Sequence, residues 1–199
     1  MAELILASQS LARRQMLEAA GVRHVAIPAR VDEEALAQSL AAAGASPRAL
    51  ADALAEAKAV KLSLLHPQAL VLGADSVLAL ADGTRLEKPG TRDGLAEQLR
   101  LLRGRSHRLI SAAVLARGGR AEWRHVAVAT LKVRAFSDAF LADYVARVPD
   151  AVLGSVGGYH VEGLGIQLFE AIAGDLFTVR GLPLLPLLQQ LRLTGYLAA

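Results

Sequence analysis

The 199-residue sequence contains no cysteine and few aromatic residues. The absence of cysteine excludes disulfides, thiol chemistry and cysteine-ligated zinc, and it agrees with a reducing compartment, so we expect a cytoplasmic protein. Because aromatics make up only 4% of the chain, the core must consist mainly of Leu, Val, Ala and Ile. The hydrophobic content of 53% is sufficient for such a core, and the length predicts a single domain over residues 1–199.

Long apolar runs and a strong net charge are also absent. No stretch reaches the roughly 18 apolar residues that a membrane helix needs, and no basic segment precedes the short N-terminal apolar run. We therefore expect neither membrane insertion nor a signal peptide. The formal net charge of +3 is too small to make nucleic acid the expected partner. Lysine is scarce, with four among the 22 basic residues, which makes each lysine of interest.

Predicted strands and helices alternate along the chain, with one hairpin in the middle. Apolar and alternating runs predict strands at 3–7, 22–28, 71–80, 107–116, 123–134 and 166–172, with GADS interrupting the third. Ser10, Ser46, Thr91 and Ser137 are typical of helix starts, and with the periodicity they predict helices at 10–20, 46–65, 91–103 and 137–147. A further helix is predicted within 182–193. This order predicts a mixed α/β (α+β) fold, in which helices flank a twisted mixed β-sheet.

The stretch LILASQSLARRQMLE places two serines and two arginines directly after the first predicted strand. A helix that starts here offers free backbone N–H groups and a positive dipole end to an anion, and Ser8 and Ser10 can add hydroxyl donors. Arg13 and Arg14 lie in the first turns, where a cation opposes the helix dipole unless an anion compensates. An ordinary helix start with two solvated arginines explains the pattern equally well. No Walker A motif is present.

Two acidic stretches are candidates for a functional site. In GADSV, Asp75 interrupts an apolar run, and a buried carboxylate is costly unless it is paired, protonated or metal-bound. This favours a functional role over a simple turn cap. In VDEEA, Glu33 follows a predicted strand and can supply a second carboxylate to a metal. An acidic helix N-terminus, favoured by the dipole, is the alternative explanation for VDEEA.

Two of the lysines occupy informative positions. Lys58 lies in ALAEAKAVK within the predicted helix 46–65, and Lys88 lies in LEKPG, where the following proline favours an extended backbone. A solvated loop lysine is the alternative explanation for Lys88. The histidines show no metal-binding spacing, so we interpret them as structural or surface groups.

Taken in order, these pieces resemble the Maf-like nucleoside triphosphate pyrophosphatases over essentially the whole chain. LASQSLARRQML is similar to the opening motif of that family, and VDE, LAEAKA, GADS, LEKPG, RGRSH, GGYHVEGLG and VRGLPL follow in the family order. The resemblance implies a mixed sheet with a deep cleft, and often a homodimer. It also implies cleavage of the α–β phosphoanhydride of a nucleoside triphosphate with Mg²⁺ or Mn²⁺.

The resemblance assigns roles to the candidate residues. It implies that Asp75 accepts the proton of the attacking water and that Glu33 is the second acidic group, with both carboxylates available to the metal. Further side chains would bind the triphosphate or stabilise its charge: Ser8, Ser10, Arg13, Arg14, Lys58 and Lys88. These roles suit phosphoryl transfer, which depends on cations and a positioned water more than on covalent chemistry.

The chain departs from the family pattern at three positions. Leu11 replaces the usual proline, and Ala12 stands where relatives carry Arg or Trp. Glu162 stands where the pyrimidine-directed branch has Gln. Guanine presents adjacent N1–H and N2–H donors that one carboxylate can accept together, and 7-methylguanine is also cationic. Glu162 therefore favours 7-methyl-GTP, and EGLGIQLFE is similar to the branch that acts on it. The resemblance places Ala12 and Ser76 with Glu162 among the residues that select the base, although Ser76 does not decide between the branches, because relatives carry Thr or Gln there.

Two alternatives remain open from the sequence. One is a pyrophosphatase for dTTP and UTP, or for other modified nucleotides. The other is a nucleotide-binding regulator of septum formation or cell shape that has no catalytic activity, a role also linked to this family. Substrate turnover separates the two classes, and the preferred base separates the two enzymes.

Overall fold

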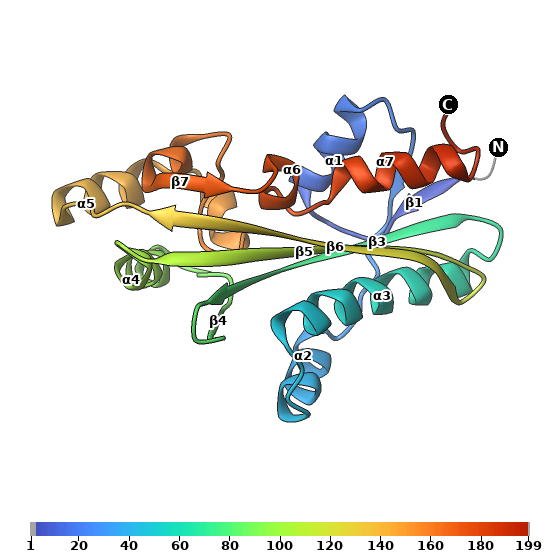
Figure 1. Ribbon diagram of the computed structural model, residues 1–199, viewed down its shortest axis with the longest axis horizontal. Helices are drawn as coiled ribbons and strands as arrows, with labels where there is room; N and C mark the ends of the chain where they lie inside the picture. Colours follow the sequence, from blue (N-terminus) through green and yellow to red (C-terminus); the bar gives the residue numbers. More distant parts are fainter. Residues whose placement is uncertain (1–2, 199) are drawn as a thin grey trace.

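A seven-stranded mixed β-sheet forms the centre of the computed structural model, which describes residues 3–198 (Figure 1). The strand order is β2-β1-β3-β5-β6-β7, with β4 paired to β3 on the side of β1. β1 is parallel to β2 and β3, whereas the other pairings are antiparallel. The strands are β1 Leu4–Leu6, β2 Val25–Ala26, β3 Leu70–Leu80, β4 Arg85–Leu86, β5 Ser106–Arg117, β6 Arg120–Val133 and β7 Phe169–Ala173. The predicted mixed α/β fold is confirmed.

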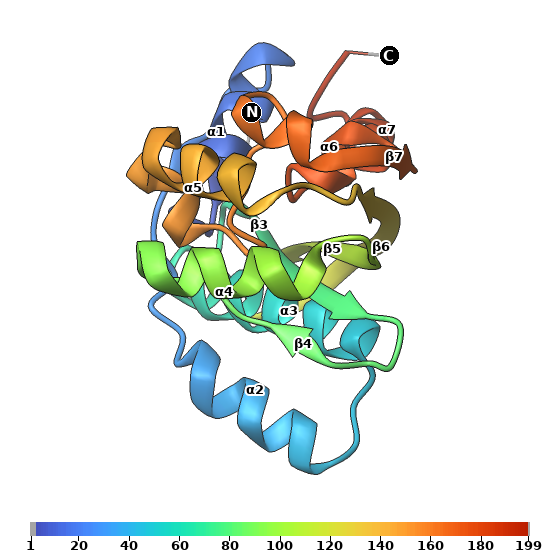
Figure 2. The same cartoon turned by 90° about the vertical axis from the view of Figure 1, so that its left-hand side faces the viewer.

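Helices cover both faces of this sheet. They are α1 Leu11–Ala19, α2 Glu33–Ala42, α3 Pro47–Leu65, α4 Arg92–Leu102, α5 Asp138–Arg147, α6 Leu176–Val179 and α7 Leu184–Leu193. α3 packs along one face with α2 beyond it, while α1, α6 and α7 lie on the opposite face (Figures 1 and 2). The predicted helix starts are confirmed, because the side chains of Ser10, Ser46, Thr91 and Ser137 cap the helices that follow them. Within residues 3–198, no helix is both long and apolar enough to cross a membrane.

Two strand predictions were wrong. β3 is not interrupted at GADS, because Gly73 and Asp75 stay in register with Val114 and Ala112 of β5. The long pairing with β5 outweighs the low strand propensity of Gly and Asp. The last strand begins only at Phe169, because residues 164–168 form a 3-10 turn instead of the predicted strand.

Residues along β3 alternate between the two faces of the sheet, as the period of a strand requires. Val77 packs with α3 residues in one core cluster, so Gly73 and Asp75 face α3 as well. Ala74 packs with Met16 of α1 and Leu187 of α7, so the even-numbered residues face the opposite layer. Asp75 and Ser76 are therefore sequence neighbours whose side chains lie on opposite faces.

A buried polar pair fastens the glycine-rich segment 154–165 to the sheet. His107 on β5 is only 1% exposed, and its Nε2 lies 2.6 Å from the hydroxyl oxygen of Tyr159. Burial lowers the pKa of His107 to about 4 and raises the pKa of Tyr159 well above its usual value. The interpretation of the histidines as structural or surface groups agrees with this position of His107.

This pair predicts acid destabilisation. The folded-state pKa of His107 lies below its ordinary value of 6.5, so its contribution to stability is complete above pH 6.5 and is lost as the pH falls towards 4. The loss should approach about 3 kcal/mol in the free energy of unfolding. We expect urea unfolding from pH 7.5 to 4 to show a shallower acid decline in His107→Gln than in wild type, whereas the control His66→Gln should keep the wild-type slope. Equal slopes in all three proteins would contradict the assignment.

Candidate functional site

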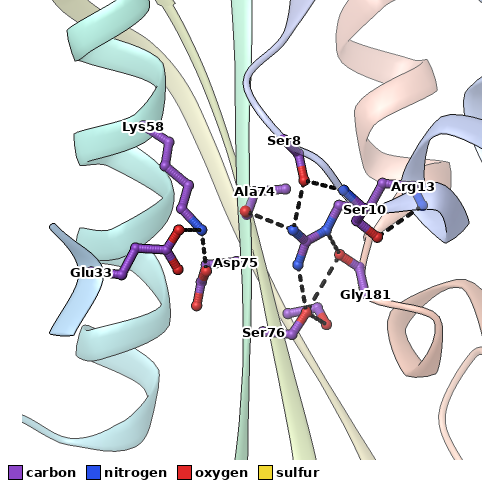
Figure 3. A network of polar contacts seen from close by, with 10 residues as sticks. Ser8, Ser10, Arg13, Glu33, Lys58, Ala74, Asp75, Ser76 and Gly181 are labelled. Atoms are coloured by element: carbon purple, nitrogen blue, oxygen red, sulfur yellow. Dashed lines mark hydrogen bonds and ion pairs between the residues drawn. The ribbon is translucent and has the colours of Figure 1, made fainter. Parts of the chain in front are cut away.

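The candidate site lies where one edge of β3 is left without a neighbouring strand. β1 pairs with residues 70–72 of β3 and β4 pairs with residues 78–79, so residues 73–77 pair with neither. Arg13 occupies this gap, and its Nη1 donates to the carbonyl oxygen of Ala74 at 3.0 Å. In Figure 3, Glu33, Lys58 and Asp75 gather on the α3 side of β3, and Arg13 lies on the other side with the serines.

A lysine and two carboxylates form the charged centre of the site. The Nζ atom of Lys58 lies 2.6 Å from Oδ1 of Asp75 and 3.0 Å from Oε1 of Glu33 (Figure 3). The side chains of Lys58 and Asp75 are only 8% and 11% exposed, whereas that of Glu33 is 49% exposed. A buried charge of either sign is costly without a partner, so each of the two buried groups compensates the other. Lys58 is therefore the partner that a carboxylate inside this apolar strand needs.

The contact between Lys58 and Asp75 depends on the close approach of α3 to β3. Gly73 faces α3, and a Cβ atom at this position would lie 2.1 Å from the carbonyl oxygen of Ala55 and 2.7 Å from the backbone nitrogen of Ala59. The small side chains of these two alanines allow the same approach from the helix. Because Lys58 lies on the same stretch of α3, the glycine and the alanines together set its distance from the carboxylate.

Glu33 reaches the cluster from a second helix. It is the first residue of α2, whose N-cap is Asp32, so the predicted acidic helix N-terminus is confirmed. Its carboxylate lies 3.0 Å from Lys58. The positive end of the helix dipole and Lys58 both stabilise its negative charge. The supply of this carboxylate to a metal stays a prediction.

The buried side chain of Arg13 links three segments of the chain by hydrogen bonds. Its guanidinium donates to the carbonyl oxygens of Gly181 at 2.8 Å and Ala74 at 3.0 Å, and to the hydroxyl oxygens of Ser8 at 3.1 Å and Ser76 at 3.0 Å. These contacts use four of the five N–H donors that a guanidinium has and leave one on Nη2. Burial lowers the pKa of Arg13, and the nearby charge of Asp75 and Glu33 opposes that effect.

Ser8 and Ser10 are oriented as hydrogen-bond donors at the start of α1. The hydroxyl oxygen of Ser8 accepts from Nη1 of Arg13 and from the backbone N–H of Ser10, and the hydroxyl oxygen of Ser10 accepts from the backbone N–H of Arg13. Among the described residues neither hydroxyl group donates a hydrogen bond, so both hydrogens are available to a ligand. The first N–H groups of α1 have no partner within the helix, so this end of the site suits an anion.

Ser76 belongs to a hydrogen-bonded chain on the same face. Its hydroxyl oxygen accepts from Nη2 of Arg13 and lies 2.9 Å from that of Ser111, which donates to the carbonyl oxygen of Thr178 at 2.8 Å. Because the one hydroxyl hydrogen of Ser111 goes to Thr178, the hydroxyl hydrogen of Ser76 is directed to Ser111 or, at 3.5 Å, to the carbonyl oxygen of Gly181. The role of Ser76 in base selection stays a prediction, as does that of Ala12, which is half-buried in the first turn of α1.

The structure does not bring every predicted residue into this cluster. Arg14 is exposed, and its nearest acidic group is Glu18 at 3.6 Å. Lys88 is exposed on the loop between β4 and α4, and within residues 3–198 it forms no hydrogen bond or ion pair with the cluster. Glu162 lies outside the cluster and pairs with Arg180. The substrate-binding roles of these residues stay predictions.

Two contributors to the site were missed by reasoning from sequence. Gly181 supplies the carbonyl that holds Nε of Arg13, and Ser111 fixes the hydroxyl of Ser76. The run RLISAAVL gave a signal for Ser111, since it is a polar residue inside an apolar strand. A carbonyl that acts through backbone geometry leaves no such signal.

Glu33 and Asp75 have the chemistry of a site for a hard divalent cation. Each uses one carboxylate oxygen for Lys58, and the second oxygen has no hydrogen-bond partner among the described residues. No group of three or more acidic, His or Cys side chains in residues 3–198 could hold a metal alone. Two carboxylates nevertheless suit Mg²⁺, which keeps several waters and usually binds through one or two carboxylates and the phosphates of a substrate.

The close approach at Gly73 predicts the effect of a single methyl group. Gly73→Ala should lower the free energy of unfolding by about 2 kcal/mol or more, because the added Cβ meets backbone atoms of α3 that cannot move alone. Gly154→Ala is the matched control, since a Cβ there meets no atom within 4 Å, and it should change stability by less than about 0.5 kcal/mol. Urea unfolding of both variants measures this. An unchanged stability of Gly73→Ala would show that α3 is not held at this distance.

Comparison with known proteins identifies the family. Residues 3–194 match the family described as Maf-like protein. A protein of Sphingopyxis alaskensis named nucleoside triphosphate pyrophosphatase is 54% identical over 96% of this chain and 97% of its own length. Two proteins named 7-methyl-GTP pyrophosphatase are similar: that of Rhizobium meliloti is 50% identical over 98% of both chains, and that of Mesorhizobium japonicum is 49% identical over 97% and 96%. The assignment to an enzyme family of pyrophosphatases is confirmed, and the chain belongs to the Maf-like protein family.

Proposed function

We propose that this chain is a nucleoside triphosphate pyrophosphatase that prefers 7-methyl-GTP and releases the nucleoside monophosphate and pyrophosphate. The observation that carries the proposal is the contact of the buried Lys58 with Asp75 and Glu33 beside the open edge of β3. This centre combines a cation, two carboxylates and a nearby helix N-terminus, which are the groups that phosphoryl transfer needs. The names of full-length relatives at about 50% identity support the same reaction.

In the proposed reaction the oxygen of a water molecule forms a bond to the α-phosphorus. The bond from that phosphorus to the bridging oxygen breaks, and pyrophosphate leaves with the electron pair. The proton of the water passes to Asp75, whose Oδ1 is held by Lys58 while Oδ2 has no partner among the described residues and can accept it. The ammonium group of Lys58 also stabilises the negative charge that develops on the phosphate oxygens.

The phosphate chain would lie against the start of α1. The hydroxyl groups of Ser8 and Ser10, the first N–H groups of the helix and the remaining N–H of Arg13 all point to an anion-binding role. Arg13 contributes its charge to the site while most of its donors hold the surrounding backbone. Arg14 and Lys88 are exposed, and we propose that a bound triphosphate recruits them as outer cations.

The divalent metal would be held by Glu33 and phosphate oxygens of the substrate, with Asp75 as a further ligand as long as its Oδ2 carries no proton. When bound, it supplies further positive charge to the triphosphate. The chemistry of two carboxylates suits both Mg²⁺ and Mn²⁺, so metal identity is a question for titration with each.

Glu162 supports the choice of base, because a carboxylate can accept the two adjacent N–H donors of guanine. The methylated base is cationic, which adds electrostatic attraction. A homodimer and a cytoplasmic location complete the proposal, and sedimentation of the purified protein tests the first of these.

Asp75→Asn tests the reaction. We expect it to lower turnover by about three orders of magnitude, because the amide cannot accept the proton of the water, while nucleotide binding persists. Pyrophosphate release in the presence of Mg²⁺ or Mn²⁺ measures the first quantity and calorimetry with the nucleotide measures the second. Asp143→Asn, an exposed change on α5, is the control and should keep wild-type turnover. If the wild-type protein releases no pyrophosphate from any nucleotide, the chain is a binding module and not an enzyme.

Glu162→Gln tests the preferred base. The panel is 7-methyl-GTP, GTP, dTTP, UTP and CTP, with kcat/KM measured for each. We expect the variant to lose at least tenfold on 7-methyl-GTP relative to dTTP, because the amide cannot accept both guanine donors. Glu170→Gln, an exposed change on β7, should leave the ratios unchanged. A wild-type preference for dTTP or UTP would instead assign the protein to the pyrimidine-directed branch.

A further inference from the structure

Glu162 has one polar partner among the described residues, and that partner is Arg180. The Nε atom of Arg180 lies 3.3 Å from Oε1 of Glu162, which leaves Oε2 without a partner. The two residues are 18 positions apart in the sequence and belong to different segments: Glu162 lies in the glycine-rich segment, and Arg180 directly follows α6. The orientation of the carboxylate is therefore set by a second loop.

The backbone that carries Arg180 is fixed on several sides. Asp175 caps α6 through the backbone N–H of Thr178 at 2.8 Å, and the N–H of Arg180 donates to the carbonyl oxygen of Leu176 at 3.0 Å. The next residue, Gly181, has φ of +98°, which other residues rarely adopt. A Cβ atom on Gly181 would lie 3.1 Å from the hydroxyl oxygen of Ser76. The backbone from which the Arg180 side chain extends is therefore held in place by these contacts.

Arg180 and Gly181 together connect the two ends of the proposed substrate site. The carbonyl oxygen of Gly181 accepts from Nε of Arg13, and the side chain of Arg180 contacts Glu162. Arg13 lies at the phosphate end of the proposed site, and Glu162 is its proposed base reader. The two ends of the proposed site are thus connected through two consecutive residues, Arg180 and Gly181.

We infer that Arg180 is a positioning residue that selects the base by holding the carboxylate of Glu162. This inference rests on the proposed function. An unheld glutamate rotates about three side-chain bonds, so only a fraction of its orientations presents Oε2 and Oε1 to two adjacent donors. The contact with Arg180 restricts those orientations before the nucleotide binds, which lowers the cost of ordering the side chain in the complex.

The pair contributes little to folding, which makes it testable. The side chains of Arg180 and Glu162 are 24% and 40% exposed, and pairs of this kind have a small effect on stability. Arg180→Gln should therefore fold as wild type does, with a melting temperature within about 2 °C. Arg147→Gln, which removes another arginine from a pair with an acidic residue, is the matched control.

A double-mutant cycle on kcat/KM tests the inference. The proteins are wild type, Arg180→Gln, Glu162→Gln and the double variant, each assayed with 7-methyl-GTP, GTP and dTTP. We expect Arg180→Gln to lose at least tenfold on the two guanine nucleotides, chiefly through KM, and less than twofold on dTTP. In the Glu162→Gln background the same substitution should have no further effect, because Arg180 acts through Glu162.

The outcomes separate this inference from the proposed function. If Arg180→Gln lowers activity on all three nucleotides equally, or adds its effect in full to Glu162→Gln, the positioning role is wrong while the pyrophosphatase stands. If it changes nothing and Glu162→Gln still alters the base preference, only the role of Arg180 fails. If wild type hydrolyses no nucleotide, the proposed function itself fails, and that result needs no variant to see.

Discussion

The buried ion pair between Lys58 and Asp75 is the interaction on which the site depends. It gives a partner to a carboxylate in the middle of an almost entirely buried strand, where a lone carboxylate would be too costly. The same lysine reaches Glu33, so one ammonium group gathers both acidic groups of the proposed centre. The packing of α3 against β3 therefore also brings the charged groups of the proposed site together.

The groups of the proposed site lie on both faces of β3. Asp75 faces α3 and meets the lysine, whereas Ala74 and Ser76 hold Arg13 from the open edge and the opposite face. The gap between β1 and β4 allows Arg13 to reach β3, so the cations approach from both sides of the sheet. Arg13 also binds the carbonyl oxygen of Gly181, and the neighbouring Arg180 contacts Glu162, the residue proposed to recognise the base.

Much of this arrangement was predictable because local signals were strong. Capping residues predicted the helix starts at Ser10, Ser46, Thr91 and Ser137. The alternation of predicted strands and helices indicated a mixed sheet. The strand of β3 was harder, since Gly73 and Asp75 break its local pattern while long pairing with β5 preserves it. An Asp inside an apolar run is unfavourable in a strand, which is why we predicted an interruption there and also why Asp75 was a candidate site residue. A residue that violates local preference needs a tertiary partner.

The sequence by itself determined the family, the fold class and the residue types of the site, because ordered motifs and helix caps are local properties of the chain. Only the tertiary structure decided which of those residues meet. It brought Lys58 to both carboxylates and turned most of the donors of Arg13 towards backbone carbonyls and serines. It also left Arg14 and Lys88 exposed and gave Glu162 its partner. The physical reason is that contacts between residues far apart in sequence depend on how closely helices and strands pack, as the missing Cβ of Gly73 shows.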